Sequence, residues 1–233
     1  MNNFDIIKNK CEEISEKIKK IGKENNENYV IDGIINLNKY LEAKNKILWI
    51  LKEANSEGSS WSYINKFQDK KWLNKCGKSI PTIKRVMYTT YGILRNPKWE
   101  NIPDAKDEKC FEPLQEIALL NIKKIPGGGN SNPKSITEAY NRNCKLLNLQ
   151  VKTYNPDIII FGNTFQYFKT ADFPNIKETK REISTFGNHS YNTGDKLYIH
   201  TWHPAVRGKG FTDKGYVTDI IQIVEKWKSQ NTL

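Results

Sequence analysis

The chain has 233 residues, of which 37% are hydrophobic and 11% are aromatic. This length and composition support a full hydrophobic core and exclude a disordered chain. A surplus of 37 basic over 26 acidic residues gives a net charge of +11, which favours a polyanionic partner, most often nucleic acid. The chain is also rich in Lys, Asn and Ile together, so part of this charge reflects a compositional bias.

Four cysteines are scattered along the chain and form no Cys-x-x-Cys pair: Cys11, Cys76, Cys110 and Cys144. Their spacing argues against a zinc ribbon or a thioredoxin-like site, and it lacks the close pairs that usually hold an iron–sulfur cluster. We therefore expect reduced thiols, no metal and no cofactor. The sequence shows neither a long apolar run nor a signal-peptide core, so we expect a cytoplasmic monomer that binds no membrane.

Helical and extended patterns alternate along the chain. Apolar residues at helical spacing predict an amphipathic helix in the first segment, with Ile7 and Ile21 near its two ends. A second short helix is expected over 33–43, and the continuous apolar run 47–51 is typical of a strand buried on both faces. A long loop over 55–80 follows. Its length is typical of functional or disordered loops, and its aromatic residues argue against disorder.

The remaining elements are expected in this order: a helix over 82–94 opened by Pro81, a buried strand over 117–122, a helix that Ser135 and Glu138 begin as a capping box and that runs to about Tyr154, a strand over 157–161, an irregular or hairpin insertion over 172–196, a strand over 196–201 and a helix over 212–228. Strands alternating with helices imply a parallel sheet that is covered on both faces. We predict an α/β fold, a three-layer α/β/α sandwich with a central four-stranded parallel sheet. One domain spans 1–233, and residues 1–45 form a helical extension packed on it.

His203 stands just after the apolar run 197–201, directly before Pro204. Ligands of open α/β sheets bind beyond the carboxyl ends of the strands, so a titratable group there is well placed to meet a substrate. Taken alone, His203 is as well explained as a structural histidine. Pro204 fixes the backbone beside the imidazole and favours the functional interpretation. His200 points to the opposite face of the strand, which argues against a metal pair.

Asn121 and Glu53 end the two earlier buried strands in a similar way. An unpaired carboxamide is expensive to bury. Asn121 therefore either caps the sheet through a hydrogen bond to a neighbouring loop or reads the edge of a base, for which it offers a donor and an acceptor. Glu53 either partners one of the many lysines or acts as a carboxylate that positions water or stabilises positive charge on a sugar.

Two glycine-containing segments suit contacts with a phosphate backbone. The run 126–129 offers backbone amides beside two lysines, although a tight turn is the simpler interpretation and no nucleotide P-loop pattern surrounds it. The second segment follows Pro204 and suits an approach to a nucleic-acid backbone. The candidate nucleic-acid contacts are Lys123, Lys124 and Gly128 in the first segment, and Arg207 and Lys209 in the second.

The aromatic residues of the long loop offer stacking surfaces: Trp61, Tyr63 and Phe67. We expect these side chains to belong in part to the core. We also expect one of them to stack on a base, a contact worth roughly 1–3 kcal/mol per base. Trp61 and Phe67 are the two candidates for substrate binding.

Taken in chain order, these motifs resemble the uracil-DNA glycosylase superfamily over about residues 46–225. That family pairs a first-strand motif of the type Gly-Glu-Ala-Pro-Gly with a later His-Pro-Ser/Ala motif. This chain has Lys-Glu-Ala-Asn at 52–55 and His-Pro-Ala at 203–205. Residues 121–130 are similar to the Asn-containing strand and Pro-Gly loop of the iron–sulfur branch, and residues 155–162 to its strand before the Gly turn. A lysine and an asparagine replace the glycine and the proline of the first motif, and the cluster cysteines are not reproduced.

The resemblance implies a uracil-DNA glycosylase-like fold. It also implies excision of uracil or another modified base from DNA, after base flipping, by hydrolysis of the N-glycosidic bond. Asn121 would read the base, Ala54 and Asn55 would contact it, and His203 would stabilise charge on the leaving base. Glu53 would favour the cationic sugar or orient water. Two alternatives use the same fold: a non-catalytic nucleic-acid-binding protein, and a hydrolase or binder of free nucleotides or bases.

Overall fold

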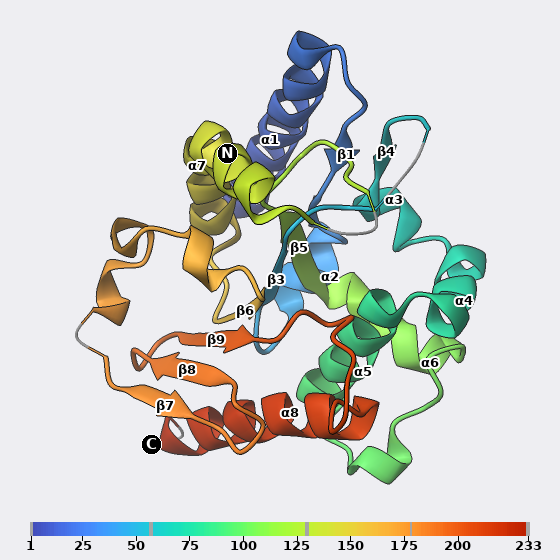
Figure 1. Ribbon diagram of the computed structural model, residues 1–233, viewed down its shortest axis with the longest axis vertical. Coiled ribbons are helices and arrows are strands. Elements are labelled where there is room, and N and C mark those ends of the chain that lie inside the picture. The colour runs from blue at the N-terminus through green and yellow to red at the C-terminus, as the bar shows by residue number, and fades with distance from the viewer. Residues whose placement is uncertain (1, 56–57, 129–130, 178, 232–233) are drawn as a thin grey trace.

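The computed structural model describes residues 2–55, 58–128, 131–177 and 179–231. Helices pack against both faces of one large mixed sheet, which makes this an α/β protein (Figure 1). The described α-helices are α1 (Asn3–Asn25), α2 (Leu37–Glu42), α3 (Tyr63–Lys66), α4 (Lys70–Ser79), α5 (Pro81–Arg95), α6 (Glu108–Phe111), α7 (Pro133–Tyr154) and α8 (Asp213–Gln230). Short 3-10 helices lie at η1 (Trp99–Asn101), η2 (Glu112–Glu116), η3 (Phe165–Tyr167), η4 (Thr170–Asp172) and η5 (Pro174–Ile176).

The described strands are β1 (Val30–Ile31), β2 (Gly33–Ile34), β3 (Ile47–Leu51), β4 (Trp61–Ser62), β5 (Ile117–Asn121), β6 (Ile158–Gly162), β7 (Arg181–Ile183), β8 (His189–Asn192) and β9 (Leu197–Thr201). The main sheet has the order β2–β5–β3–β6–β9–β8–β7, and β1 pairs with β4 in a separate ribbon. Within the main sheet, β5, β3, β6 and β9 run parallel. The strands outside this group pair antiparallel with their neighbours.

The α/β class is confirmed, but the sheet is mixed and wider than the four parallel strands that we predicted. Gly33–Ile34, expected to begin a helix, pairs antiparallel with β5 instead. The helix α2 starts only at Leu37, where the side chain of Asn36 caps it. The insertion 172–196 contains β7 and β8, which extend the sheet beyond β9. The segment 1–45 thus contributes an edge strand to the main sheet.

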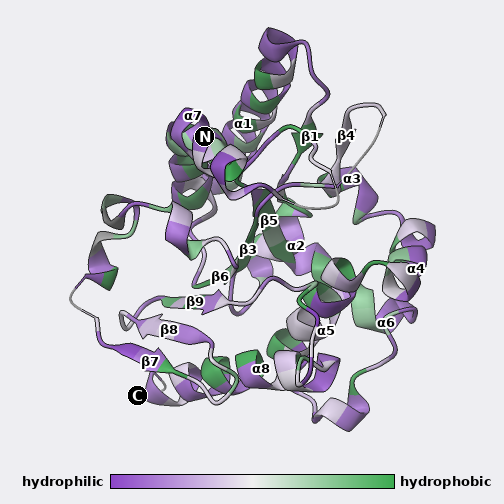
Figure 2. Cartoon of the chain, in the orientation of Figure 1, coloured by the Kyte–Doolittle hydropathy of each residue, from purple (hydrophilic) through white to green (hydrophobic). Residues whose placement is uncertain are grey.

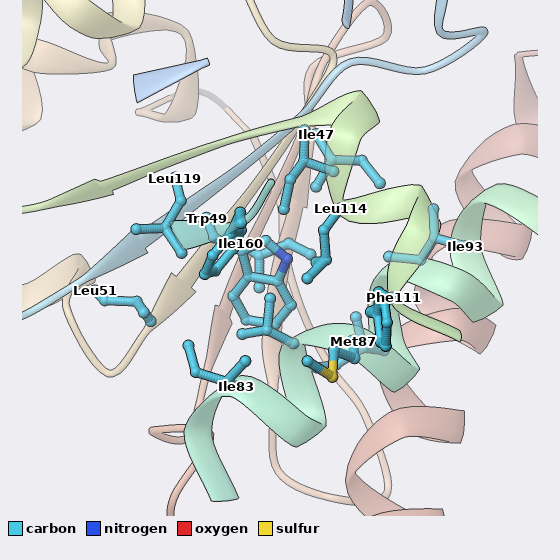
Figure 3. Packing of buried hydrophobic residues seen from close by; sticks show 14 of the residues in the cluster. Ile47, Trp49, Leu51, Ile83, Met87, Ile93, Phe111, Leu114, Leu119 and Ile160 are labelled. Atoms are coloured by element: carbon cyan, nitrogen blue, oxygen red, sulfur yellow. The ribbon is translucent and has the colours of Figure 1, made fainter. Parts of the chain in front are cut away.

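Side chains of the buried strands alternate between two cores. In β3, Ile47, Trp49 and Leu51 belong to one core, while Leu48 and Ile50 belong to the other, as expected for a strand covered on both faces. Figure 3 shows the first core between the sheet and α5, with the indole of Trp49 inside it. The second core lies under α1 and α7, which pack together. In Figure 2 the free end of α1 is hydrophilic, whereas β5 is hydrophobic.

Three predicted helices are confirmed as α1, α5 and α8. The long helix α7 is also present, but the predicted capping box at Ser135 is wrong. The side chain of Asn132 accepts a hydrogen bond from the Lys134 amide, and Pro133 takes the first helical position, where its missing N–H is no loss. The segment 55–80 is more than a loop, since its described part contains β4, α3 and α4. No described helix combines the length and the apolar character of a membrane span.

Candidate functional site

The parallel strands β5, β3, β6 and β9 end at one edge of the sheet, and the segments after them carry the predicted site residues. Backbone pairing continues past the ends of β3 and β5. The Lys123 amide donates to the Lys52 carbonyl at 3.0 Å, and the Gly127 amide donates to the Ala54 carbonyl at 2.8 Å. These hydrogen bonds hold the first-strand motif and the glycine loop side by side.

His203 is half-buried in the segment after β9. Burial lowers the pKa of His203 to about 4, with a further contribution from the positive charge of Lys52. The imidazole is therefore neutral at physiological pH. Its Nδ1 accepts a hydrogen bond from the Ala205 amide at 3.1 Å, which assigns the remaining proton to Nε2. Since Nε2–H has no hydrogen-bond partner among the described residues, it is left to donate to a ligand.

Arg85, which we did not predict, fixes the loop that follows His203. Its buried guanidinium pairs with Asp213 at 2.8 Å. It also donates to three carbonyl oxygens of the loop: Pro204 at 3.1 Å, Val206 at 2.8 Å and Phe211 at 2.8 Å. The rigid fork of an arginine suits this task. Nothing in the pattern of α5 distinguishes this arginine from an exposed one, so the sequence carried no signal for its role.

The ring of Pro204 packs on Gly162, the last residue of β6. A Cβ at Gly162 would lie 3.0 Å from Pro204 Cδ and 2.7 Å from Leu51 Cδ2, so glycine is needed for this close approach. The ends of β3, β6 and β9 are thereby packed together. His200 is directed to the second core, where it stacks on Phe165 with ring centroids 5.5 Å apart.

The carboxylate of Glu53 is 5% exposed and forms an ion pair with Lys123 at 3.1 Å. It lies directly on the backbone of Gly127, where an added Cβ would be 1.9 Å from Glu53 Oε2. Position 127 therefore needs a glycine because the carboxylate fills the space of a side chain. We expected Lys123 on a phosphate backbone, but in the structure it neutralises Glu53.

The side chain of Asn121 is buried at the end of β5. It is 1% exposed, and neither Oδ1 nor Nδ2 has a hydrogen-bond partner among the described residues. Its backbone amide is held by Asp32 Oδ2 at 2.8 Å. Burial raises the pKa of Tyr63, and a hydrogen-bonding interaction with Asn121 opposes this rise. The Tyr63 hydroxyl therefore lies near the carboxamide, although the two groups fall outside hydrogen-bond geometry. A buried polar group without a partner costs about 1–3 kcal/mol, which makes the Asn121 carboxamide a candidate for pairing with a ligand.

Asp32 and Lys124 form a fully buried ion pair, in which both carboxylate oxygens lie 2.8 Å from Lys124 Nζ. Gln150 Nε2 donates to Asp32 Oδ1 at 2.8 Å. Burial lowers the pKa of Lys124, and the Asp32 charge counteracts this effect. The expected phosphate contact of Lys124 is therefore wrong, because its ammonium faces an internal carboxylate. Asp32 was missed, although an acidic residue inside the apolar run 30–35 is a signal for a buried pair.

Lys52 is half-buried just after β3. Burial lowers the pKa of Lys52, and the negative charge of Glu53 opposes this effect. Its ammonium forms no hydrogen bond or ion pair with the described residues. The positive charge of Lys52 also contributes to the lowered pKa of His203. Lys52 thus interacts electrostatically with both Glu53 and His203.

Trp61 and Phe67 belong to one aromatic cluster. The ring centroids are 4.5 Å apart for Trp61 and Tyr63, and 5.5 Å apart for Tyr63 and Phe67. Phe67 is fully buried, so the expectation that it could stack on a base is wrong, and it fills the core instead. Trp61 is only partly buried, and its Nε1 is enclosed without a hydrogen-bond partner among the described residues.

The other predicted contacts near Glu53 differ in exposure. Ala54 is buried, whereas Asn55 is exposed and forms a parallel bridge with Gly127. Gly128 is exposed, with open space around its Cα. Positions 129–130 of the predicted glycine loop lie outside the described residues. Asn55 and Gly128 are thus placed at the surface beside the ion pair of Glu53.

Arg207 and Lys209 are exposed on the loop that Arg85 fixes. Trp202, which precedes His203 in the chain, is 45% exposed. Its ring packs edge-on against Phe211, with centroids 5.3 Å apart. The segment 202–209 therefore presents two cations and one aromatic face to solvent. Sequence reasoning found the cations but missed Trp202, which the preceding apolar strand made look like part of the core.

A cavity of about 590 Å³ is lined by the segments 22–29 and 125–126, and it does not include Glu53, Asn121 or His203. The candidate site is therefore defined by the side chains at the strand ends and not by this cavity. Within the described part of the chain, no group of three or more His, Cys, Asp or Glu side chains is placed to hold a metal ion.

The sequence matches no protein-family model and no curated protein.

Proposed function

We propose that the protein is a uracil-DNA glycosylase-like enzyme, which excises uracil or another modified base from DNA by hydrolysing the N-glycosidic bond. Two groups at one sheet edge support this: the buried, unpaired carboxamide of Asn121 and the Nε2–H of His203 that is left to donate. A carboxamide matches the donor and acceptor edge of a pyrimidine. A neutral imidazole suits a base oxygen that gains negative charge.

The order of the parallel strands adds support. Three of the segments that resemble the superfamily lie at or just after the ends of β3, β5 and β9, and the order β5–β3–β6–β9 brings these ends to one edge. We propose that these four strands are the uracil-DNA glycosylase-like core of a single domain. In this proposal the antiparallel strands β2, β8 and β7 are additions to the edges of that core.

In the proposed reaction, the target nucleotide leaves the base stack, at a cost of roughly a few kcal/mol. The C1′–N bond breaks with its electron pair moving to the base, and His203 donates a hydrogen bond to the oxygen that gains charge. Water adds to C1′ and loses a proton to solvent, and the departing base is protonated by solvent. Because Glu53 is already paired with Lys123, it acts by orienting water rather than as an unpaired general base.

DNA is the proposed partner because the net charge of the chain and the exposed cations after His203 both favour a polyanion. The chain has a net charge of +11, and Arg207 and Lys209 are exposed on the loop that follows His203. Cations of this kind bind the phosphate backbone without sequence preference. The exposed ring of Trp202, directly before His203, offers a surface for stacking or for a wedge between bases.

One observation favours a second function, nucleic-acid binding without catalysis. Lys52 stands where the resembling motif has a glycine, and its charge acts on His203. In this alternative the lysine side chain takes the space of a flipped base and pairs with phosphate.

Base release separates the two functions. Purified protein is incubated with single- and double-stranded oligonucleotides that carry uracil, hypoxanthine, xanthine or mismatched thymine, and free base is measured by mass spectrometry. We expect release of at least one base, and loss of that release in His203→Ala and Asn121→Ala. His189→Ala, which changes a histidine of β8, should retain it. Salt-sensitive DNA binding without release, equal in wild type and His203→Ala, would establish the second function instead.

A further inference from the structure

Three lysines follow the ends of β3 and β5, and one of them differs from the other two. Lys124 is buried against Asp32, and Lys123 pairs with Glu53. Lys52 has neither kind of partner among the described residues, although it is half-buried at the edge that carries the proposed site. A lysine that is partly desolvated and kept out of ion pairs suits an amine nucleophile.

We propose that Lys52 is a catalytic amine, which attacks the C1′ aldehyde of an abasic deoxyribose and cleaves the DNA strand beside it. This inference rests on the proposed function, because base excision creates that aldehyde at the same edge of the sheet. The substrate class is therefore DNA with an abasic site.

The neighbours of Lys52 are arranged to leave its amine reactive. Lys123 holds the carboxylate of Glu53, so that carboxylate does not fix Lys52 in a direct ion pair. His203 is neutral and adds no cation. Burial lowers the pKa of Lys52 against the opposing charge of Glu53, which increases the fraction of unprotonated amine near neutral pH.

The step balances without an oxidant or a metal. The Lys52 amine adds to the C1′ carbonyl to give a carbinolamine, which loses water to form an imine. The imine acidifies C2′, a proton leaves C2′ to water, and the electron pair expels the phosphate from C3′. The downstream strand then carries a 5′ phosphate, and water hydrolyses the imine to restore the Lys52 amine and to leave the upstream strand with an unsaturated aldehyde at its 3′ end.

An oligonucleotide with a preformed abasic site isolates this step from base excision. A separate glycosylase prepares it from a uracil-containing strand. Cyanoborohydride reduces the imine to a stable amine, so wild-type protein should form a covalent protein–DNA adduct, and peptide mapping should place it on Lys52. Without the reductant, the strand should be cleaved. Lys52→Ala and Lys52→Arg should lose both adduct and cleavage, whereas Lys71→Ala, an exposed lysine of α4, should keep both.

The outcomes distinguish this inference from the function on which it rests. Base release by wild-type protein without any adduct on the preformed abasic site would overturn the role of Lys52 and leave base excision standing. An adduct on Lys52 without release of any base would support the amine and overturn excision. An adduct on another lysine would overturn the assignment. If Lys52→Ala does not fold, the mapped position of the wild-type adduct decides the question.

Discussion

Two polar regions of the molecule, one inside the fold beside β5 and one along the edge where the parallel strands end, differ in how their groups are paired. In the internal region, Asp32 and Lys124 satisfy each other at 2.8 Å with no exposure to solvent. At the sheet edge, the Asn121 carboxamide, the Nε2–H of His203 and the Lys52 ammonium lack hydrogen-bond partners among the described residues. Both regions are polar and largely buried, so burial alone does not separate them. Under the proposed function, the paired groups of the internal region hold the fold, and the unpaired groups at the edge are left for a ligand.

Buried ions hold the backbone at Asn121 and in the loop that follows His203. Asp32 accepts the amide of Asn121, and Arg85 binds three carbonyl oxygens of the loop after His203. The ligand-facing side chains can therefore stay without partners while their positions are fixed, which is the support that a precise site requires.

The largest effect is expected when the internal pair is broken. Lys124→Met keeps the length of the side chain but leaves Asp32 buried without a cation, so the free energy of unfolding should fall by about 3–5 kcal/mol. Urea unfolding followed by circular dichroism measures this change. Lys17→Met, which removes an exposed ion pair on α1, should cost about 0.5 kcal/mol or less.

The double variant Asp32→Asn with Lys124→Met sharpens this prediction. Removal of both charges should recover part of the loss, because the penalty lies in the uncompensated ion rather than in the lost attraction. If Lys124→Met is as mild as Lys17→Met, the internal region does not hold the fold and the comparison fails.

The next effect comes from the loop that carries His203. Arg85→Met should lower the free energy of unfolding by about 2–3 kcal/mol, because three loop carbonyls lose a charged donor. Asp213 keeps Lys84 as a partner, with Nζ 2.6 Å from its Oδ2, so no buried charge is left alone. Arg95→Met on the same helix is the control, since its pair with Glu116 is more exposed and worth about 1 kcal/mol at most. Equal losses in the two variants would contradict the anchoring role of Arg85.

The strand ends were predictable from the sequence, whereas the partners of the charged residues were not. The runs ending at Leu51, Asn121 and Thr201 are mostly apolar, and a parallel sheet brings such ends to one edge. The strand Gly33–Ile34 was missed because two residues show no periodicity, and only its pairing with β5 makes it a strand.

The lysines after β5 show why the details of the site were beyond a single sequence. Lys123 and Lys124 are neighbours of the same type, yet one pairs with Glu53 and the other with Asp32. Their partners come from segments 70 and 92 residues away, so local pattern does not choose between a phosphate contact and an internal pair. Phe67 is a similar case, because tertiary packing alone decides between the core and a stacking surface.

The pH dependence of stability tests the burial of His203. The unfolded chain takes up a proton on this imidazole below about pH 6.5, whereas the folded protein does so only near pH 4. Stability should therefore fall as pH decreases from about 6.5 to about 4, and this group adds no further loss below that range. His203→Gln removes this contribution. The free energy of unfolding should therefore change less between pH 7 and pH 4.5 than it does in wild type, by about 2 kcal/mol. Parallel curves for the two proteins would mean that the imidazole is not desolvated.

The smallest change in stability is expected at Asn121, the buried group without a partner at the sheet edge. Asn121→Leu replaces an unpaired buried carboxamide by an apolar side chain of similar size, so it should stabilise the protein by about 1 kcal/mol while abolishing base release. Asn143→Leu is the matched control: that carboxamide is also buried, but it donates to the Ile122 carbonyl at 3.0 Å, and its loss should destabilise by about 1–2 kcal/mol. Opposite signs for two buried asparagines, in urea unfolding at one pH, would show that Asn121 is retained for a ligand. A similar loss of stability in both variants would instead show that the Asn121 carboxamide belongs to the fold.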